Sequence, residues 1–381
     1  MFEHLLTEEQ KMMRDAAREY AVKRIYPNAE HWDKEGKVPD EVLKELGELG
    51  YLGLTIAESY GGMEVDTLSY LLVVEELSRA CAGLGIMVSV QNTLCATAIS
   101  LFGSDEQKQK YLPRLAAGEI GAYALTEPDA GTDATAIHLN AKVDGDDYVL
   151  NGSKMFVTNA GLAKLFIVFC STDPEKGSHG LSALVVEAGT PGFEIGKAEE
   201  KMGIKASDTR ALSFDDARVP VANRLGEEGS GIKIALTILD HGRMGVAAQA
   251  IGIGEAAFAE ARKYSKERHQ FGHPIADFQA IAFKLADMRV KLDASRMMLD
   301  RAVRISMSGK RFSMEASEAK LFASESANWV ANEAVQIHGG YGYIKEYPVE
   351  RYFRDARITE LYEGTSEAQR IVISRAILKD D

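Results

Sequence analysis

The sequence predicts an α+β protein with an N-terminal all-α domain (1–120), a middle β-barrel-like domain (121–230) and a C-terminal four-helix bundle domain (231–381). Up to about residue 118, apolar residues recur every three or four positions, which is the period of an amphipathic helix. From residue 121 to about 231, short β-rich runs alternate with turn residues. Long helical patterns follow. These two changes of pattern place the domain boundaries.

The N-terminal domain is expected to consist of helices, and one helix start carries a specific signal. Leu43 and Leu46 illustrate the helical spacing. Ser104 and Gln107 form the pattern of a capping box, in which the hydroxyl accepts from an unpaired amide and the glutamine reaches back. A helix is therefore predicted to begin at this point and to end at Gly118.

The middle domain is expected to be built from short strands. Turn signals separate them: Asp144 to Asp147 predicts one turn, and Asn151-Gly152 predicts a hairpin, because a two-residue primed turn favours residues that tolerate positive φ. The predicted strands are 138–143, 148–150, 154–158, 166–170 and 181–186.

The C-terminal domain is predicted to begin after a glycine-rich linker at 227–231. Its helices are expected at 232–266, 278–308 and 314–338, with a fourth bundle member at 366–379. Gly252 and Gly254 approximate a dinucleotide fingerprint, but no strand precedes them. They are better explained by close packing between helices.

Composition excludes several classes of function. The 381 residues carry a formal net charge of -13 and are 46% hydrophobic, which is typical of a globular protein with a large core and disfavours nucleic acid as a partner. The three cysteines form no CxxC pair, and the eight histidines show no HExxH pattern, so reduced thiols and no metal site are expected. Neither a basic, apolar leader nor an uninterrupted apolar run of about 18 residues is seen, so a cytoplasmic location without a membrane span is expected.

Two segments far apart carry chemistry. Tyr362-Glu363-Gly364-Thr365-Ser366 offers one carboxylate on a turn softened by glycine, between two helical patterns. Most loop glutamates are simply hydrated, so this segment alone is a weak signal. The second segment, 123–133, gathers small residues, hydroxyls and carboxylates around Pro128 and Gly131.

These segments resemble signatures of the acyl-CoA dehydrogenase family of flavoenzymes. Arg268-His-Gln-Phe271, then Gln279, then 336–342 lie between them in the family's order, so the resemblance covers nearly the whole chain. It implies the acyl-CoA dehydrogenase fold, FAD as cofactor, an acyl-CoA substrate, a homotetramer and an electron-transferring flavoprotein as electron acceptor.

The resemblance implies that Glu363 removes the α proton of the thioester while a hydride leaves the β carbon for FAD N5. Burial is expected to raise the pKa of this carboxylate toward that of the α carbon. Residues implied in cofactor binding are Tyr123, Leu125, Thr126, Thr132, Phe156, Thr158, Arg268, Phe271, Gln279, Gln336, Gly339, Gly340 and Thr365. Residues implied in substrate binding are Thr132, Asp240, Arg243, Tyr362 and Gly364.

Simpler explanations exist for several of these residues. Tyr123 and Phe156 taken singly fit core aromatics, and Arg268 fits a solvated cation at a helix end. Asp240 and Arg243 lie three apart on a helix and fit an intrahelical ion pair. Gly339 and Gly340 also fit an ordinary helix end.

Two positions depart from the pattern of some family members. Phe156 stands where the family often has Trp, so the aromatic face is kept and the indole N–H is lost. Gly242 stands where some relatives carry the base, and glycine cannot act as one. Glu363 is the only carboxylate that fits the role.

The expected activity is dehydrogenation of a short or medium acyl-CoA to the trans-2-enoyl-CoA. Branched or alicyclic acyl groups remain open. A glutaryl-type enzyme is disfavoured, because Gly85 stands where such relatives hold an arginine. An acyl-CoA oxidase is the alternative enzyme, although the usual extra C-terminal domain is not found before Asp381. A non-enzymatic flavoprotein is disfavoured by the presence of Glu363.

Overall fold

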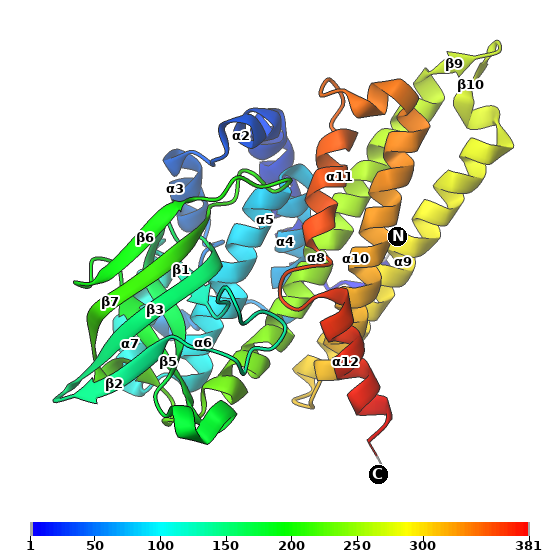
Figure 1. Cartoon of the computed structure of the whole chain (residues 1–381). Coiled ribbons are helices and arrows are strands. Elements are labelled where there is room, and N and C mark those ends of the chain that lie inside the picture. The colour runs from blue at the N-terminus through cyan, green and yellow to red at the C-terminus, as the bar shows by residue number, and fades with distance from the viewer. Residues whose placement is uncertain (1–2, 380–381) are drawn as a thin grey trace.

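A computed structural model describes residues 3–379 and confirms the α+β architecture: helices come before and after the sheet in the sequence, and the sheet lies to one side of the packed helices (Figure 1). The predicted capping box is present, because the Ser104 hydroxyl accepts from the amide of Gln107 and the Gln107 side chain accepts from the amide of Ser104. Gly118, with φ of 107°, follows the end of that helix. The N-terminal helices are α1 (Glu8–Tyr20), α2 (Ala29–Glu35), α3 (Asp40–Glu48), α4 (Thr67–Ala80), α5 (Ala82–Ser89), α6 (Thr97–Phe102) and α7 (Asp105–Ala116).

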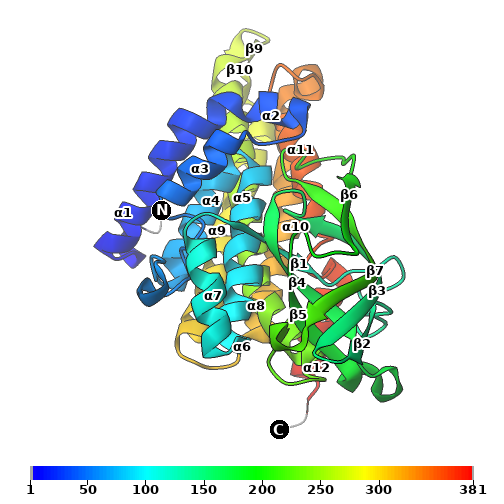
Figure 2. The same cartoon turned by 90° about the vertical axis from the view of Figure 1, so that its left-hand side faces the viewer.

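A π-helical stretch joins α5 to α6 and makes one continuous helical run, Ala82–Phe102. By length and composition it is the one helix within residues 3–379 that could cross a membrane. However, 83% of the most apolar 18-residue stretch of this helix is buried inside the protein, as in the core helix of a globular domain. Figure 2 shows α4 and α5 between the outer helices α1 and α3 and the sheet.

The middle domain is an eight-stranded sheet that folds over on itself. The strand order is β6-β7-β3-β2-β4-β5-β8, with β1 paired to β4. Phe166 on β4 packs edge-on against Phe193 on β6 with ring centroids 4.9 Å apart, although three strands separate them in the sheet, so two layers enclose a core. The strands are β1 (Ile120–Ala124), β2 (Asn140–Asp144), β3 (Asp147–Thr158), β4 (Ala163–Ser171), β5 (Leu181–Glu187), β6 (Phe193–Ala198), β7 (Thr209–Pro220) and β8 (Arg224–Leu225).

The predicted hairpin at Asn151-Gly152 is wrong, because β3 runs straight through both residues. Gly152, with φ of 140°, lies instead at an irregularity in the pairing of β3 with β7. The side chain of Asn151 exchanges two hydrogen bonds of 2.9 Å with Asp216 on β7. The turn that joins β2 to β3 is the predicted one at Asp144 to Asp147, where these two residues pair.

The C-terminal part consists of α8 (Gly231–Glu267), α9 (Gln279–Met307), α10 (Ser313–His338), α11 (Val349–Ile358) and α12 (Ser366–Ile377), with a small hairpin of β9 (His269–Gln270) and β10 (His273–Pro274). The helix predicted as the fourth bundle member exists as α12, but it packs chiefly on α10. The shorter α11 packs against both α8 and α10 and completes the bundle.

Close packing around α8 explains its glycines. A Cβ on Gly252 would lie 2.4 Å from the carbonyl oxygen of Glu75 on α4. A Cβ on Gly254 would lie 2.6 Å from Cδ2 of Leu292 on α9. This confirms the packing interpretation of the pair and excludes the nucleotide fingerprint.

Candidate active site

Glu363 lies on the turn between α11 and α12, in a conformation unusual for a glutamate. Its φ of 51° falls in the left-handed region, and the next residue, Gly364, has φ of 93°. Both carboxylate oxygens are buried and have no hydrogen-bond partner within the described chain. Burial raises the pKa of Glu363 to about 7, because desolvation disfavours the charged form. A strained residue with an unsatisfied buried carboxylate is typical of a functional site.

Helix α8 forms the wall against which this carboxylate lies. A Cβ on Gly242 would lie 1.9 Å from Oε2 of Glu363 and 2.8 Å from Cδ2 of Leu94, so the space exists only because residue 242 has no side chain. Further along α8, the fully buried Gln249 accepts a hydrogen bond from the hydroxyl of Tyr362 and donates one of 3.0 Å to the carbonyl of Ala82. Tyr362 is thereby held beside the base.

Two buried cations oppose the effect of desolvation. The charges of Lys320 and Arg243 lower the pKa of Glu363, although burial has the larger effect. Arg243 donates to Asp240 at 2.6 Å and to the hydroxyl of Ser317 at 3.2 Å. The intrahelical ion pair expected between Asp240 and Arg243 is therefore present, next to the base.

The turn itself is held from two helices. The carbonyl oxygen of Gly364 accepts hydrogen bonds from Lys320 Nζ at 2.6 Å and from Gln369 Nε2 at 2.8 Å. The hydroxyl of Thr365 caps α12 by accepting from the amide of Ala368 at 3.2 Å. These hydrogen bonds hold the shape of the turn.

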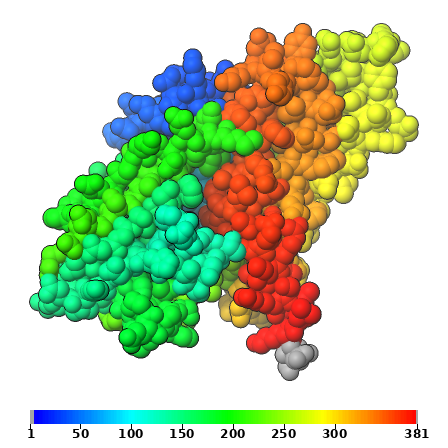
Figure 3. Space-filling view, in the orientation of Figure 1, coloured from blue at the N-terminus to red at the C-terminus, as the bar shows by residue number. Residues whose placement is uncertain are grey.

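The middle domain reaches this site through β1. The Tyr123 hydroxyl donates to the carbonyl of Ala235 on α8 at 3.4 Å, and its pKa is raised by burial and by the charge of Glu363. Tyr123 packs against Phe169 of the sheet, so it serves the core as well. In Figure 3, the surface of the segment between β1 and β2 borders that of the chain around α12.

The other predicted cofactor residues of the middle domain lie on adjacent backbone. The carbonyl of Leu125 accepts from Lys154 Nζ at 3.0 Å, and that of Thr126 accepts from the amide of Met155 at 2.8 Å, so the loop after β1 is tied to β3. Phe156 on β3 is 63% exposed with φ of 57°, which excludes its interpretation as a core aromatic. Thr158 ends the same strand, and Thr132 is exposed in the loop before β2.

A second group of predicted residues gathers at the other end of α8. Arg268, Phe271, Gly339 and Gly340 line one hollow of about 700 Å³, and Phe271 is 90% exposed. A Cβ on either glycine would meet nothing within 4 Å, so their backbone is open to a ligand. The exposed Gln279 and Gln336 lie beside this hollow, at the start of α9 and in the last turn of α10.

The two groups are too far apart to form a single small-molecule site within one chain. Gly242 and Arg268 are 26 residues apart along α8, about 39 Å at the rise of an α-helix. Figure 1 shows the β9–β10 hairpin at the opposite end of the bundle from α12. The hollow is therefore separate from the site at Glu363 within the same chain.

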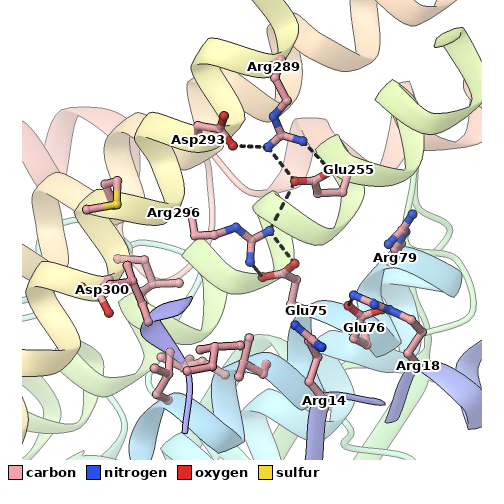
Figure 4. Close-up of a pocket in the computed structure, with 17 residues that line it drawn as sticks. Arg14, Arg18, Glu75, Glu76, Arg79, Glu255, Arg289, Asp293, Arg296 and Asp300 are labelled. Atoms are coloured by element: carbon pink, nitrogen blue, oxygen red, sulfur yellow. Dashed lines mark hydrogen bonds and ion pairs between the residues drawn. The ribbon is translucent and has the colours of Figure 1, made fainter. Parts of the chain in front are cut away.

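A further hollow of about 250 Å³ lies between α1, α4, α8 and α9 (Figure 4). Five arginines and five acidic side chains line it, so its charge is balanced. Arg296 binds Glu75 through two hydrogen bonds of 2.6 and 2.7 Å and also contacts Glu255. This network joins helices and leaves no net charge for an ionic ligand.

Three residues at the site were not identified from the sequence: Gln249, Lys320 and Gln369. A signal existed for one of them. Lys320 lies in the helical row of Ala316, Ala323 and Ala327, all buried, and a lysine in an apolar row is uncommon. Within residues 3–379, no group of three His, Cys, Asp or Glu side chains is placed to hold a metal ion.

Three family profiles match the chain: "Acyl-CoA dehydrogenase, N-terminal domain" at residues 7–119, "middle domain" at 122–217 and "C-terminal domain" at 229–378. The chain is 49% identical to a short-chain specific acyl-CoA dehydrogenase of Clostridium acetobutylicum, over 98% of this chain and 99% of that one. It superposes on butyryl-CoA dehydrogenase of Megasphaera elsdenii with a TM-score of 0.96 and 48% identity, covering 98% of this chain and 99% of that chain.

A third similar chain comes from a structure described as the electron transferring flavoprotein of Acidaminococcus fermentans, in work on flavin-based electron bifurcation. Its TM-score is 0.97 at 51% identity, and the match covers 98% of this chain and 99% of that chain. Matches of this identity and coverage, together with the three domain profiles, establish the relationship. The chain belongs to the acyl-CoA dehydrogenase family.

Proposed function

We propose that this protein dehydrogenates a short-chain acyl-CoA to the trans-2-enoyl-CoA, with Glu363 as the base that removes the α proton. One observation carries the proposal: the carboxylate of Glu363 is buried, unpartnered and has a pKa of about 7. A general base is most effective when its pKa lies near the working pH, because it is then both ionised and basic enough to take the proton.

The cofactor of this family is FAD. The chain has features that fit it: the exposed Phe156, the tied loop of Leu125 and Thr126, and open backbone at Gly339 and Gly340. We assign the flavin ring to Phe156, Leu125 and Thr126, together with Tyr123, Thr132, Thr158 and Thr365. We assign the adenosine half of FAD to the hollow of a neighbouring copy of the chain, which is lined by Arg268 and Phe271 and lies beside Gln279 and Gln336. The chemistry that bound FAD supplies is acceptance of the β hydride.

The protein's own residues orient the thioester and move the proton. The backbone N–H of Glu363 makes no hydrogen bond within the described chain, so it is free to bind the thioester oxygen on which negative charge develops. Tyr362 shields one side of the base, and Gly242 leaves the space in which the carboxylate lies. Asp240, Arg243, Thr132 and Gly364 are assigned to the substrate.

The substrate class and the partners are inferred from the relatives. The short-chain specific and butyryl-CoA names of the matched proteins favour a short acyl group. The match to a chain described with an electron transferring flavoprotein favours that class of protein as electron acceptor. The separation of the two residue groups along α8 favours a homo-oligomer, and we propose the tetramer. No observation favours the oxidase alternative.

We further propose the domain boundaries at 120/121 and 230/231 and a cytoplasmic location. The boundaries agree with the start of α8 at Gly231, while β1 begins at Ile120, one residue before the first boundary. The location is consistent with the bacterial relatives and would be tested by cell fractionation.

Anaerobic titration with acyl-CoA thioesters of increasing length tests the proposed activity. Loss of the yellow flavin absorbance reports hydride transfer directly, without any electron acceptor. Butyryl-CoA is expected to bleach the flavin faster than octanoyl-CoA or isobutyryl-CoA. No bleaching with any of these thioesters would contradict the proposed reaction, and preferential bleaching by the longer or branched thioester would overturn the choice of substrate.

A further inference from the structure

We propose that Lys320 is a positioning residue for the base: it fixes the turn that carries Glu363 and supplies a positive charge that keeps the buried carboxylate ionised. The proposal rests on the proposed role of Glu363 as the base. It concerns a residue on α10, 43 positions before Glu363 in the sequence.

The geometry ties Lys320 to the turn. Its side chain is 0% exposed, and its ammonium donates to the carbonyl oxygen of Gly364 at 2.6 Å. The neutral amide of Gln369 donates to the same oxygen at 2.8 Å, so this carbonyl already has one partner. Burying a lysine costs considerable free energy, and a second donor to one carbonyl oxygen does not by itself account for it.

Within its surroundings, the ionised carboxylate of Glu363 is stabilised mainly by the positive charge of nearby side chains. Neither carboxylate oxygen accepts a hydrogen bond within residues 3–379, so no donor offsets its desolvation. The cations that face it are Lys320 from α10 and Arg243 from α8, and the Arg243 charge is shared with Asp240 at 2.6 Å. Lys320 has no acidic partner at ion-pair distance among residues 3–379. It is therefore the less compensated of the two charges.

The remaining groups near the base do not supply positive charge. The charge of Glu363 acts on the hydroxyls of Tyr70, Tyr123 and Tyr362, which come from α4, β1 and the turn; burial raises the pKa of each, so all three are neutral at physiological pH. Burial lowers the pKa of Lys320 to about 8, although the charges of Glu363, Glu360 and Glu367 oppose this effect. Lys320 thus remains largely protonated at pH 7.

A purely structural role and the proposed role differ in pH dependence. If Lys320 only clamps the turn, its removal lowers activity by the same factor at every pH. If its charge also holds Glu363 ionised, its removal shifts the ionisation of the base to higher pH. Since kcat/KM follows the ionisation of the free enzyme, the acidic limb of its pH profile separates the two.

The experiment compares four holoenzymes with butyryl-CoA and an artificial electron acceptor from pH 5.5 to 9. Lys320→Met removes both charge and donor at similar volume, and Lys320→Arg keeps the charge. Ser324→Ala, a change at another buried position of α10, is the matched control. The parent is expected to show a midpoint near pH 7, and Lys320→Met one that is higher by about one pH unit or more, with a loss at least about sevenfold larger at pH 6.5 than at pH 9.

Lys320→Arg and Ser324→Ala are expected to keep the parent's midpoint. A Lys320→Met profile with an unchanged midpoint would overturn the proposal, as would an equal shift in Lys320→Arg. If Lys320→Met does not fold with bound FAD, Lys320→Gln, which is also uncharged, takes its place and must show the same shift. The Glu363→Gln variant distinguishes failure of the Lys320 proposal from failure of the assignment of Glu363 as the base. If that variant is inactive while Lys320 variants keep the midpoint, only this proposal fails; if it is active, the assignment of the base fails first.

Discussion

Gly242 and Glu363 occupy adjoining space so closely that a Cβ on the glycine would lie 1.9 Å from Oε2 of the glutamate. The two residues are 121 positions apart in the sequence, and the missing side chain of one makes room for the carboxylate of the other. Some relatives carry the base at the position of Gly242. In this chain the carboxylate beside position 242 belongs instead to Glu363, on the turn before α12.

Gly242→Ala is expected to lower kcat at least about tenfold, because a misplaced base loses the orientation on which proton transfer depends. Alanine in a helix interior is favoured over glycine by about 1 kcal/mol, so α8 itself should tolerate the change. The matched control is Gly47→Ala in α3, where a Cβ would come no closer than 3.4 Å to another atom. Steady-state kinetics with butyryl-CoA compare the two; equal activities would show that the carboxylate does not need this space.

The free energy of unfolding should record the cost of ionising Glu363. Its pKa is raised from 4.5 to about 7, so its stabilising contribution is fully present below pH 4.5 and is lost as pH rises through 7. Glu363→Gln removes this titration and should be more stable than the parent by up to about 3 kcal/mol at pH 8.5. The difference should shrink toward pH 5. Denaturant unfolding at both pH values measures it, and a difference independent of pH would contradict the raised pKa.

The buried ion pair of Lys154 and Glu127 should matter for stability more than the exposed pairs do. Lys154 donates to Glu127 at 2.7 Å, and Glu127 also accepts from the amides of His138 and Leu139. Lys154→Met leaves Glu127 buried without its cation and should cost about 3–5 kcal/mol.

The control for this change is Arg218→Met, which breaks exposed contacts with Asp144 and Asp147 and should cost at most about 1 kcal/mol. Equilibrium unfolding in urea compares the two variants. Losses of similar size would show that burial of the Lys154 pair has little effect.

Much of the fold could be predicted because the signals for its helices and turns lie in residues that are close together in the sequence. The amphipathic period and the Ser104 cap are properties of neighbouring residues, and both were found where predicted. The strands β6 and β7 were not predicted: β6 has a single buried side chain, Phe193, and the alternation of buried and exposed side chains in β7 is broken in its middle by the two exposed residues Asp215 and Asp216. Asn151-Gly152 has the composition of a turn, but β3 pairs with the neighbouring strand β7, and this pairing overrides the local preference.

The site was predictable only in part, for a similar reason. Glu363 stands within a recognisable turn sequence, and its burial follows from packing that the turn alone does not specify. Lys320, Gln249 and Gln369 reach the turn from three different helices, so their role depends on how α8, α10 and α12 pack. No spacing in the sequence connects them.

Arg268→Ala should weaken retention of FAD, because a cation that lines the distal hollow is lost from the proposed adenosine site. The Kd for FAD is expected to rise at least about fivefold, about 1 kcal/mol of affinity, and the flavin-to-protein ratio after dialysis is expected to fall. Lys263→Ala, an exposed cation on the same helix, is the control and should retain the parent's ratio. An unchanged ratio in Arg268→Ala would count against a site shared between copies.

The central claim is that the carboxylate of Glu363 removes the α proton, and anaerobic reduction of Glu363→Gln by butyryl-CoA tests it most directly. The variant is expected to bind FAD and thioester normally, since the amide fills the same space. Its flavin should bleach at least about a hundredfold more slowly than that of the parent, the scale of a lost general base. Bleaching at the parent's rate would contradict the account.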